Sequence, residues 1–230
     1  MRVVSLVPSV TESLSAWALE PVACTRFCER PDLPHVGGTK DPDIAAIVAL
    51  APDLVVVDEE ENRREDADAL RSAGLEIFAT AVRSVADVAD QLGALAARVG
   101  VDPAGTLPAP GAGPVVAVRS RAFVPIWRRP WIALGLDTYG SSLLASLGVG
   151  NVIDGRERYP EVELDEVRAL HPDAVLAPSE PYPFRERHLE ELSAVAPAQL
   201  VDGQDLFWWG VRTTAARARL RSQLGAAPSQ

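Results

Sequence analysis

Short apolar runs alternate along the chain with segments whose apolar residues recur at helical spacing. The runs at 3–7 (VVSLV), 21–27 (PVACTRF), 54–57 (LVVV) and 75–79 (LEIFA) are typical of strands. Helical spacing covers 43–51, where Pro52 ends the pattern, and 64–74, where Gly74 closes it. Ser9 and Thr11 are the candidate caps of a first helix after Pro8. Strands that alternate with helices predict a parallel sheet.

The longest helical pattern covers 84–100, with Ser84 as its cap, Gly100 as its end and Val88, Leu92 and Leu95 on one face. The next fourteen residues, VDPAGTLPAPGAGP, are too rich in proline and glycine for regular structure. We therefore expect an N-terminal α/β lobe at 1–83, a connecting helix and linker at 84–114, and a C-terminal α/β lobe at 115–230.

The pattern restarts after the linker. Strands are expected at 115–118, 151–153, within 164–178 and at 199–202, and helices at 138–148, at the start of 164–178, at 186–195 and at 210–224. The phrase ALAPDLVVV (49–57) returns as ALHPDAVLA (169–177), so one local structure is built twice. The predicted fold class is α/β: two doubly wound lobes joined by a backbone helix and a Pro/Gly linker. A ligand cleft is expected between them, at the ends of parallel strands.

Composition narrows the class of protein. A chain of 230 residues with 47% hydrophobic and 23% charged residues is globular. A net charge of -10 has the wrong sign for a protein that binds nucleic acid through phosphates. No apolar run approaches the roughly 18 residues of a membrane span. Because strand-like residues begin at Arg2, we expect no signal peptide and a cytoplasmic location. Two cysteines are too few for a disulfide scaffold.

Several segments, in this order, resemble those of class III substrate-binding proteins. They are RVVSLVPSVTESL, TRFC, VGGTK, LAPDLVVV with ENRRED, and RYPEVELDEVRALHPDAVLAPSEPYPF. That family comprises cobalamin, haem and siderophore receptors with a helical backbone between two lobes. The resemblance implies that a ligand is held between the lobes, for delivery to an ABC importer, and that no reaction is catalysed. It implies no intrinsic cofactor, the ligand being a corrinoid, haem or a ferric siderophore.

Three departures from the family pattern affect the functional prediction. The chain shows no export signal, its connecting helix is short, and the family's two docking-glutamate positions are Ala45 and Asp165. We therefore predict a cytoplasmic binding protein for a metal chelate or tetrapyrrole, with importer docking doubtful. One alternative is the solute-binding component of an ABC importer for cobalamin or a ferric siderophore. Another is a chelatase-like enzyme that uses His35 and Glu60 as proton acceptors. A third is an interaction module with a tryptophan interface.

The candidate ligand-binding residues are those expected in loops at the strand ends. Aromatic residues in such loops stack on conjugated ligands, but filling the core of a lobe is an equally good explanation for them. Lys40 is the only lysine beside 21 arginines, and it follows a GG pair. For Cys28, a buried structural role is favoured over metal ligation. No catalytic motif or metal-ligand spacing is present, so no catalytic or metal residue is predicted. The full candidate set is Ser9, Arg26, Phe27, Cys28, Lys40, Glu60, Asn62, Arg63, Trp127, Trp131, Glu180, Tyr182, Trp208 and Trp209.

Overall fold

The computed structural model describes residues 1–103, 105–109 and 116–225. The chain divides into two compact units. The first comprises Met1–Val82, Asp87–Ala109 and Trp209–Val211. The second comprises Arg83–Ala86, Pro110–Trp208 and Arg212–Gln230, of which 110–115 and 226–230 lie outside the described residues. Each unit has a parallel sheet of its own, so the predicted two-lobed α/β fold is confirmed.

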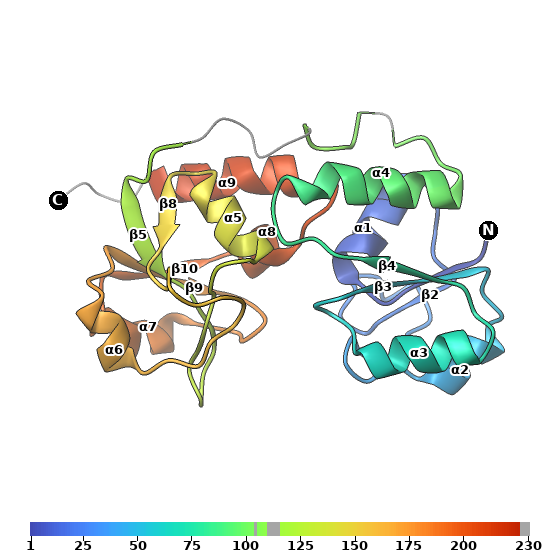
Figure 1. Cartoon of the computed structure of the whole chain (residues 1–230), viewed down its shortest axis with the longest axis horizontal. Helices are drawn as coiled ribbons and strands as arrows, with labels where there is room; N and C mark the ends of the chain where they lie inside the picture. Colours follow the sequence, from blue (N-terminus) through green and yellow to red (C-terminus); the bar gives the residue numbers. More distant parts are fainter. Residues whose placement is uncertain (104, 110–115, 226–230) are drawn as a thin grey trace. The chain divides into compact units, whose positions relative to one another are not determined.

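The first unit has a four-stranded sheet in the order β2-β1-β3-β4, with every pair parallel. The strands are β1 (Val3–Ser5), β2 (Ala23–Cys24), β3 (Leu54–Asp58) and β4 (Ile77–Thr80). Helices α1 (Pro8–Ala16) and α4 (Asp87–Val99) cover one face, while α2 (Ile44–Ala49) and α3 (Arg64–Ser72) cover the other (Figure 1). Strands β1 and β3 are buried throughout, as the apolar runs predict for a sheet covered on both faces.

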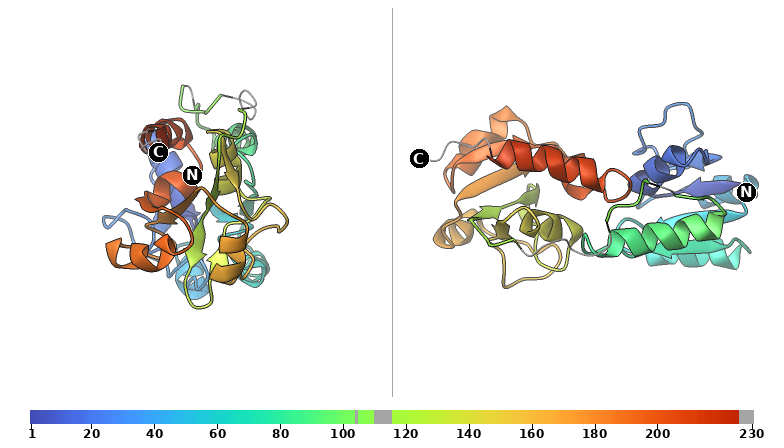
Figure 2. Two further views of the ribbon diagram at one scale, coloured as in Figure 1. Left: turned by 90° about the vertical axis from the view of Figure 1, so that its left-hand side faces the viewer. Right: turned by 90° about the horizontal axis from the view of Figure 1, so that it is seen from above.

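The second unit repeats this plan in the order β10-β9-β5-β8, again all parallel. Its strands are β5 (Ser120–Phe123), β8 (Val149–Asn151), β9 (Ala174–Pro178) and β10 (Ala198–Val201). Helices α5 (Tyr139–Ala145), α8 (Gly203–Phe207) and α9 (Thr213–Gly225) lie on one face, and α6 (Leu164–Ala169) and α7 (Glu186–Ser193) on the other (Figure 1). An antiparallel hairpin, β6 (Pro125–Trp127) and β7 (Ile132–Ala133), follows β5. Figure 2 shows α4 extended along the first unit and α9 along the second.

The repeated PD phrase has the same hydrogen bonds in both units. In the first unit the Asp53 amide donates to the carbonyl of Arg2 at 2.8 Å, and the Asp53 carboxylate accepts from the Arg2 amide at 2.6 Å. In the second unit Asp173 makes both bonds with Arg121, at 2.8 and 2.7 Å. Each aspartate therefore fixes the start of β3 or β9 to the neighbouring strand, and this explains why the phrase is built twice.

The two copies also turn in the same way. Ala51 and His171, each two residues after the end of its helix, have φ of 45° and 51°. A non-glycine residue at positive φ is uncommon. The proline that follows in each copy cannot continue a helix, and α2 and α6 both end before it, α2 at Ala49 rather than at the predicted residue 51.

Several predicted boundaries are wrong. Helix α1 begins at Pro8 after an extended Val7 and has no side-chain cap, so Ser9 and Thr11 lie inside it. Helix α4 begins at Asp87, three residues after Ser84. The strand expected at 115–118 lies at Ser120–Phe123, because this segment pairs with β8 and β9 whereas Val118 is 59% exposed. Val115 lies outside the described residues.

Four further elements differ from the sequence prediction: one strand is displaced, and two strands and one helix are additional. Strand β8 covers Val149–Asn151 rather than 151–153. The β6–β7 hairpin and the five-residue helix α8 are additional elements. Helix α4 packs as part of the first unit, so a separate connector at 84–114 stays a prediction. Among the described helices, none combines the length and apolar character needed to cross a bilayer.

Candidate ligand-binding residues at the carboxyl edges of the two sheets

The turn after β2 carries Arg26 and Phe27 at the carboxyl edge of the first sheet. Arg26 is paired with Asp41 at 2.9 Å, and its guanidinium lies 4.9 Å from the ring centroid of the 53% exposed Phe27. A Cβ at Gly38 would lie 2.4 Å from the Asp41 carboxylate and 2.7 Å from the Arg26 guanidinium. The VGG segment therefore leaves room for this ion pair. Both candidate residues remain exposed at the edge.

The side-chain amide of Asn62 connects three segments at this edge by hydrogen bonds. Its Oδ1 accepts from the Asp58 amide at 2.8 Å. Its Nδ2 donates to the carbonyls of Leu6 at 3.3 Å and Thr39 at 2.9 Å. Asn62 is 7% exposed, so it links the ends of β1 and β3 to the loop before Lys40. We assign Asn62 a positioning role.

The charged residues at this edge are placed by backbone contacts. Lys40 Nζ donates to the Glu60 carbonyl at 2.5 Å. Arg63 is the exposed residue before α3. The carboxylate of Asp58 accepts from the Glu60 and Glu61 amides at 2.9 and 3.3 Å, and from the Thr80 hydroxyl at 2.8 Å. Burial raises the pKa of Asp58, and these hydrogen bonds offset part of the rise.

Two further candidates of the first unit are buried. Ser9 is 3% exposed inside α1, where its carbonyl accepts from the Ser13 hydroxyl at 2.9 Å. Cys28 is 5% exposed and lies 3.2 Å from the Thr11 hydroxyl. His35, the proton acceptor of the chelatase-like alternative, is exposed, and its Nε2 lies 3.1 Å from the Arg30 carbonyl.

Aromatic side chains gather at the carboxyl edge of the second sheet. Trp127 meets Tyr182 edge to face at 5.6 Å between centroids, and Trp131 stacks on Phe184 at 6.1 Å with 4° between planes. Tyr182 lies 4.8 Å from Phe184, which joins the two pairs. We call these four residues the aromatic cluster. Trp127 is 44% exposed whereas Phe184 is 3% exposed, so the cluster is anchored in the core and open at one end.

Arg128 and Phe184 belong to this arrangement but are absent from the sequence prediction. Arg128 lies 5.8 Å from the Trp131 ring centroid and pairs with Glu191 of α7 at 2.8 Å. The hydrogen bonds that Arg128 donates to the Glu191 carboxylate raise the pKa of the Arg128 guanidinium. Arg128 lies between two tryptophans and Phe184 ends the SEPYPF segment. Their interleaving with the predicted aromatics is the signal that could have identified them.

The remaining ligand-binding candidates in the second half of the chain are Glu180, Trp208 and Trp209. The Arg212 guanidinium lies 5.0 Å from the centroid of the half-buried Trp208. Trp209 is 4% exposed and is grouped with the first unit. Glu180 is half-buried against Gly203, where a Cβ would lie 2.5 Å from its Cγ. One face of the Trp208 ring is therefore already covered by a cation.

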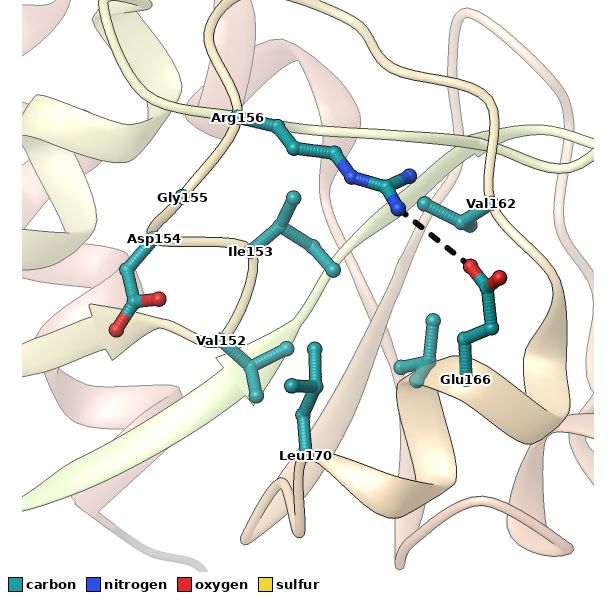
Figure 3. Close-up of a pocket in the computed structure, with 9 residues that line it drawn as sticks. Val152, Ile153, Asp154, Gly155, Arg156, Val162, Glu166 and Leu170 are labelled. Atoms are coloured by element: carbon teal, nitrogen blue, oxygen red, sulfur yellow. Dashed lines mark ion pairs between the residues drawn. The ribbon is translucent and has the colours of Figure 1, made fainter.

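A cavity of about 310 Å³ lies in the second unit, between the loop after β8 and α6 (Figure 3). Its apolar lining includes Val152, Ile153 and Val167 from the core, and the Arg156–Glu166 ion pair at 3.5 Å spans one side. No predicted ligand-binding residue lines it. Its volume is at the lower end of the range of about 300–1,000 Å³ for ligand sites. In the part of the chain that the structure describes, no group of three or more His, Cys, Asp or Glu side chains could hold a metal ion.

The fold and these edges define a binding protein built from two α/β units. Residues 3–105 match the family model described as Periplasmic binding protein. This match agrees with the resemblance to class III substrate-binding proteins that the sequence indicates. The family model describes binding proteins, which favours a binding function over the chelatase-like alternative.

Curated relatives and solved structures agree with this assignment. The chain is 27% identical over 192 residues to the vitamin B12-binding protein of Salmonella choleraesuis (strain SC-B67), covering 76% of this chain and 71% of the relative. The corresponding protein of Vibrio vulnificus (strain CMCP6) is 25% identical over 190 residues, covering 76% and 70%.

Two solved structures share the fold. The periplasmic vitamin B12 binding protein BtuF of Vibrio cholerae has a TM-score of 0.77 at 20% identity, covering 100% of this chain and 98% of that chain. A periplasmic haem-binding protein from Pseudomonas aeruginosa has a TM-score of 0.79 at 19% identity, covering 99% and 94%. These structures establish the likeness of fold.

Proposed function

We propose that the chain reversibly binds a tetrapyrrole-type small molecule, a corrinoid first and haem second, and catalyses no reaction. The aromatic cluster carries this proposal. A flat conjugated macrocycle gains stacking and apolar contact from rings held at fixed angles, worth about 0.5–1.5 kcal/mol per ring pair beyond burial. The names of the curated relatives, which are vitamin B12-binding proteins, favour the corrinoid.

The contacts in the cluster suggest a division of work among its members. Trp127 is 44% exposed and meets Tyr182 at 77° between planes, so no ring of the cluster is stacked parallel to it. The buried Phe184 stacks on Trp131 and also contacts Tyr182, which it supports from the core. Trp127 is therefore the ring that we assign to ligand contact. A rigid aromatic held by its neighbours loses little conformational entropy on binding.

In the first unit, Phe27 and Arg26 are the corresponding candidates. Phe27 is exposed, and the guanidinium above it is held by Asp41. A cation at this position favours ligand carboxylates or amide oxygens, which charge-assisted hydrogen bonds would orient. Lys40, fixed to the Glu60 carbonyl, is the second cation of this edge.

We further propose that the chain is the solute-binding component of an ABC importer, since its relatives are periplasmic binding proteins. A cytoplasmic protein without an importer is the second candidate, and two observations favour it. Both cysteines are free thiols, which are typical of a reducing compartment. At the family's docking positions, Ala45 has no charge and Asp165 is paired with Arg168 at 3.1 Å.

Binding is tested by titrating the purified chain with cyanocobalamin and, separately, with haemin, following tryptophan fluorescence and ligand absorbance. We expect saturable binding, which Trp127→Ala weakens roughly tenfold, because about 1.4 kcal/mol corresponds to one decade. Tyr159→Ala is the matched control: Tyr159 is 40% exposed, lies outside the cluster, and should leave affinity unchanged. Unchanged affinity in Trp127→Ala would contradict the assignment, and no binding of either probe would contradict the function.

Fractionation of the native host, with the mass of the mature protein, distinguishes an exported importer component from a cytoplasmic protein. An exported or lipid-anchored form would support the importer component. A full-length protein in the cytosolic fraction would support the second candidate. Binding of the purified chain to the membrane-embedded permease, compared with that of Asp165→Ala, would show whether this carboxylate contributes to docking despite its pairing with Arg168.

A further inference from the structure

Two buried thiols lie side by side at the carboxyl end of β2. Cys24 is the last residue of that strand and is 0% exposed, while Cys28 is 5% exposed at the end of the following turn. The Cys28 amide donates to the Thr25 carbonyl at 3.1 Å, which closes the turn and brings residue 28 back toward the strand. The two side chains are hydrogen-bonded to each other, and both are free thiols.

The two thiols have different surroundings. Cys28 Sγ lies 3.2 Å from the Thr11 hydroxyl and 3.4 Å from the Thr25 hydroxyl. The Cys24 thiol and these hydroxyls lower the pKa of Cys28 to about 6, against the effect of burial. The pKa of Cys24 is raised by its hydrogen bond with Cys28 and by burial. These surroundings therefore favour the thiolate at Cys28 over a thiolate at Cys24.

We propose that Cys24 and Cys28 form an oxidation site, in which a peroxide converts the two thiols into an intramolecular disulfide. The Cys28 sulfur attacks one oxygen of the peroxide and breaks the O–O bond, which gives a sulfenic acid and releases hydroxide or water. The Cys24 sulfur then attacks the Cys28 sulfur, and the sulfenic oxygen leaves as water. The two thiols lose two electrons and the peroxide gains them. Thiols in contact across a turn are the geometry that this second step requires.

The oxidised turn would differ from the reduced one at the candidate ligand residues. Arg26 and Phe27 lie between the two cysteines, and the Arg26 amide donates to the Gly37 carbonyl at 2.9 Å. Closing the disulfide removes the Cys28 thiol hydrogen, so this sulfur can no longer donate to the Thr11 hydroxyl of α1 or to the Thr25 hydroxyl, and the turn gains a covalent link to β2. Oxidation therefore changes how firmly Arg26 and Phe27 are held. Their exposure also gives a small peroxide its path to Cys28 through local opening of the turn.

The first test counts thiols in the purified chain before and after treatment with hydrogen peroxide, by alkylation under denaturing conditions and intact mass. We expect the loss of both thiols and of two hydrogen atoms in the monomer, with full recovery after dithiothreitol. In Cys24→Ala, Cys28 should stop at a sulfenic acid that dimedone traps. In Cys28→Ala, Cys24 should react at least about tenfold more slowly, since the thiolate is the reactive form. Two thiols that persist, or a disulfide-linked dimer, would overturn the proposal.

The second test needs no ligand, so its failure is distinct from a failure of the proposed function. Amide hydrogen exchange is compared between the reduced and oxidised wild type. We expect changed protection at residues 25–28 and at the first turn of α1, and no change at the β9 edge of the second unit. Cys24→Ala, treated identically, should show no disulfide-dependent change. Equal protection in the two redox states would contradict the coupling to the turn.

Discussion

The two sheets share one plan, but their carboxyl edges differ. In the first unit the edge is braced by hydrogen bonds, with Asn62 tying two strand ends to a loop and the cations Arg26 and Lys40 at the surface. In the second unit the corresponding edge is aromatic, with Trp127 exposed above the buried Phe184. The features common to both units fix the sheets, whereas the differences lie in the loops. We therefore assign the proposed ligand contacts to the loops, which differ between the two units.

The strongest contrast between the edges is that one aromatic ring is buried and the other exposed. We expect Phe184→Ala to destabilise the second unit by about 3–5 kcal/mol, because it removes a buried ring and leaves a cavity. Phe27→Ala should leave stability almost unchanged, since Phe27 is 53% exposed. Chemical denaturation of both variants, followed by circular dichroism, measures the difference.

The matched titration sharpens this contrast. Phe27→Ala should weaken cyanocobalamin binding without loss of stability, whereas a variant of Phe184 loses stability first. Equal stability losses in the two variants would show that the edges are packed alike. That result would contradict the division of the aromatic residues into support and contact.

The second prediction compares two buried asparagines with the same local role. In the second unit Asn151 Nδ2 donates to the Leu134 carbonyl at 2.8 Å, and its Oδ1 accepts from the Ile153 amide at 2.9 Å. We expect Asn62→Ala and Asn151→Ala each to cost about 1–3 kcal/mol, because buried partners lose their hydrogen bonds. Only Asn62→Ala should increase amide exchange around Thr39 and Lys40.

Unchanged exchange around Thr39 in Asn62→Ala would contradict the positioning role, even if stability fell. Asn62→Asp is the conservative test, since it keeps Oδ1 but loses both Nδ2 donors. It should retain the bond from the Asp58 amide and still loosen the loop before Lys40.

A third prediction concerns pH and the buried Asp58. Because burial raises its folded pKa above the usual 3.8, the folded state keeps a proton that the unfolded chain has released. The free energy of unfolding therefore falls as pH rises from about 3.8, the pKa in the unfolded chain, to the raised pKa of the folded state. Asp58→Asn should remove this slope, since an amide keeps an acceptor for the Glu60 and Glu61 amides. Denaturation of both proteins across this window checks the sign.

Other carboxylates make the protein less stable as pH falls. The quantity to measure is therefore the difference in unfolding free energy between wild type and Asp58→Asn at each pH. The pKa of Asp32 is lowered to about 2 by Arg30, and that pair is lost as pH falls, not as it rises. An identical pH slope in wild type and Asp58→Asn would show that Asp58 is ionised in the folded protein at all these values.

The alternation of strands and helices could be predicted because it rests on local periodicity and on the prolines and glycines that end each element. The bracing of the first edge could not. Asn62 reaches the carbonyls of Leu6 and Thr39, which are 56 and 23 residues away. A sequence shows a polar residue near a strand end but not whether its hydrogen bonds are already made. The sequence predicts Asn62 as a ligand contact, which stays a prediction, and the structure shows that its buried amide also links two strand ends to a loop.

The ring contacts of the aromatic cluster could not be predicted from the sequence either. Trp131 and Phe184 lie far apart in the chain, yet they stack with 4° between their planes. The residue types in both loops predict a binding edge and a core role equally well, and the cluster contains both a buried ring, Phe184, and an exposed ring, Trp127. Whether a ring is buried or exposed depends on how the β6–β7 hairpin packs against the loop after β9. This packing joins distant parts of the chain, so local sequence spacing does not determine it.

The smallest expected effect tests the part that the units share. Asp53→Asn and Asp173→Asn each keep the backbone bond to Arg2 or Arg121 and weaken the bond that the carboxylate accepts. Both aspartates are exposed, so we expect each change to cost about 1 kcal/mol, and the two costs to be equal within error. The double variant should show their sum, because the two sites lie in different units and share no partner. Urea denaturation of the four proteins measures this. A loss of stability in only one of the two single variants would mean that the aspartate of the repeated phrase stabilises only one of the two sheets.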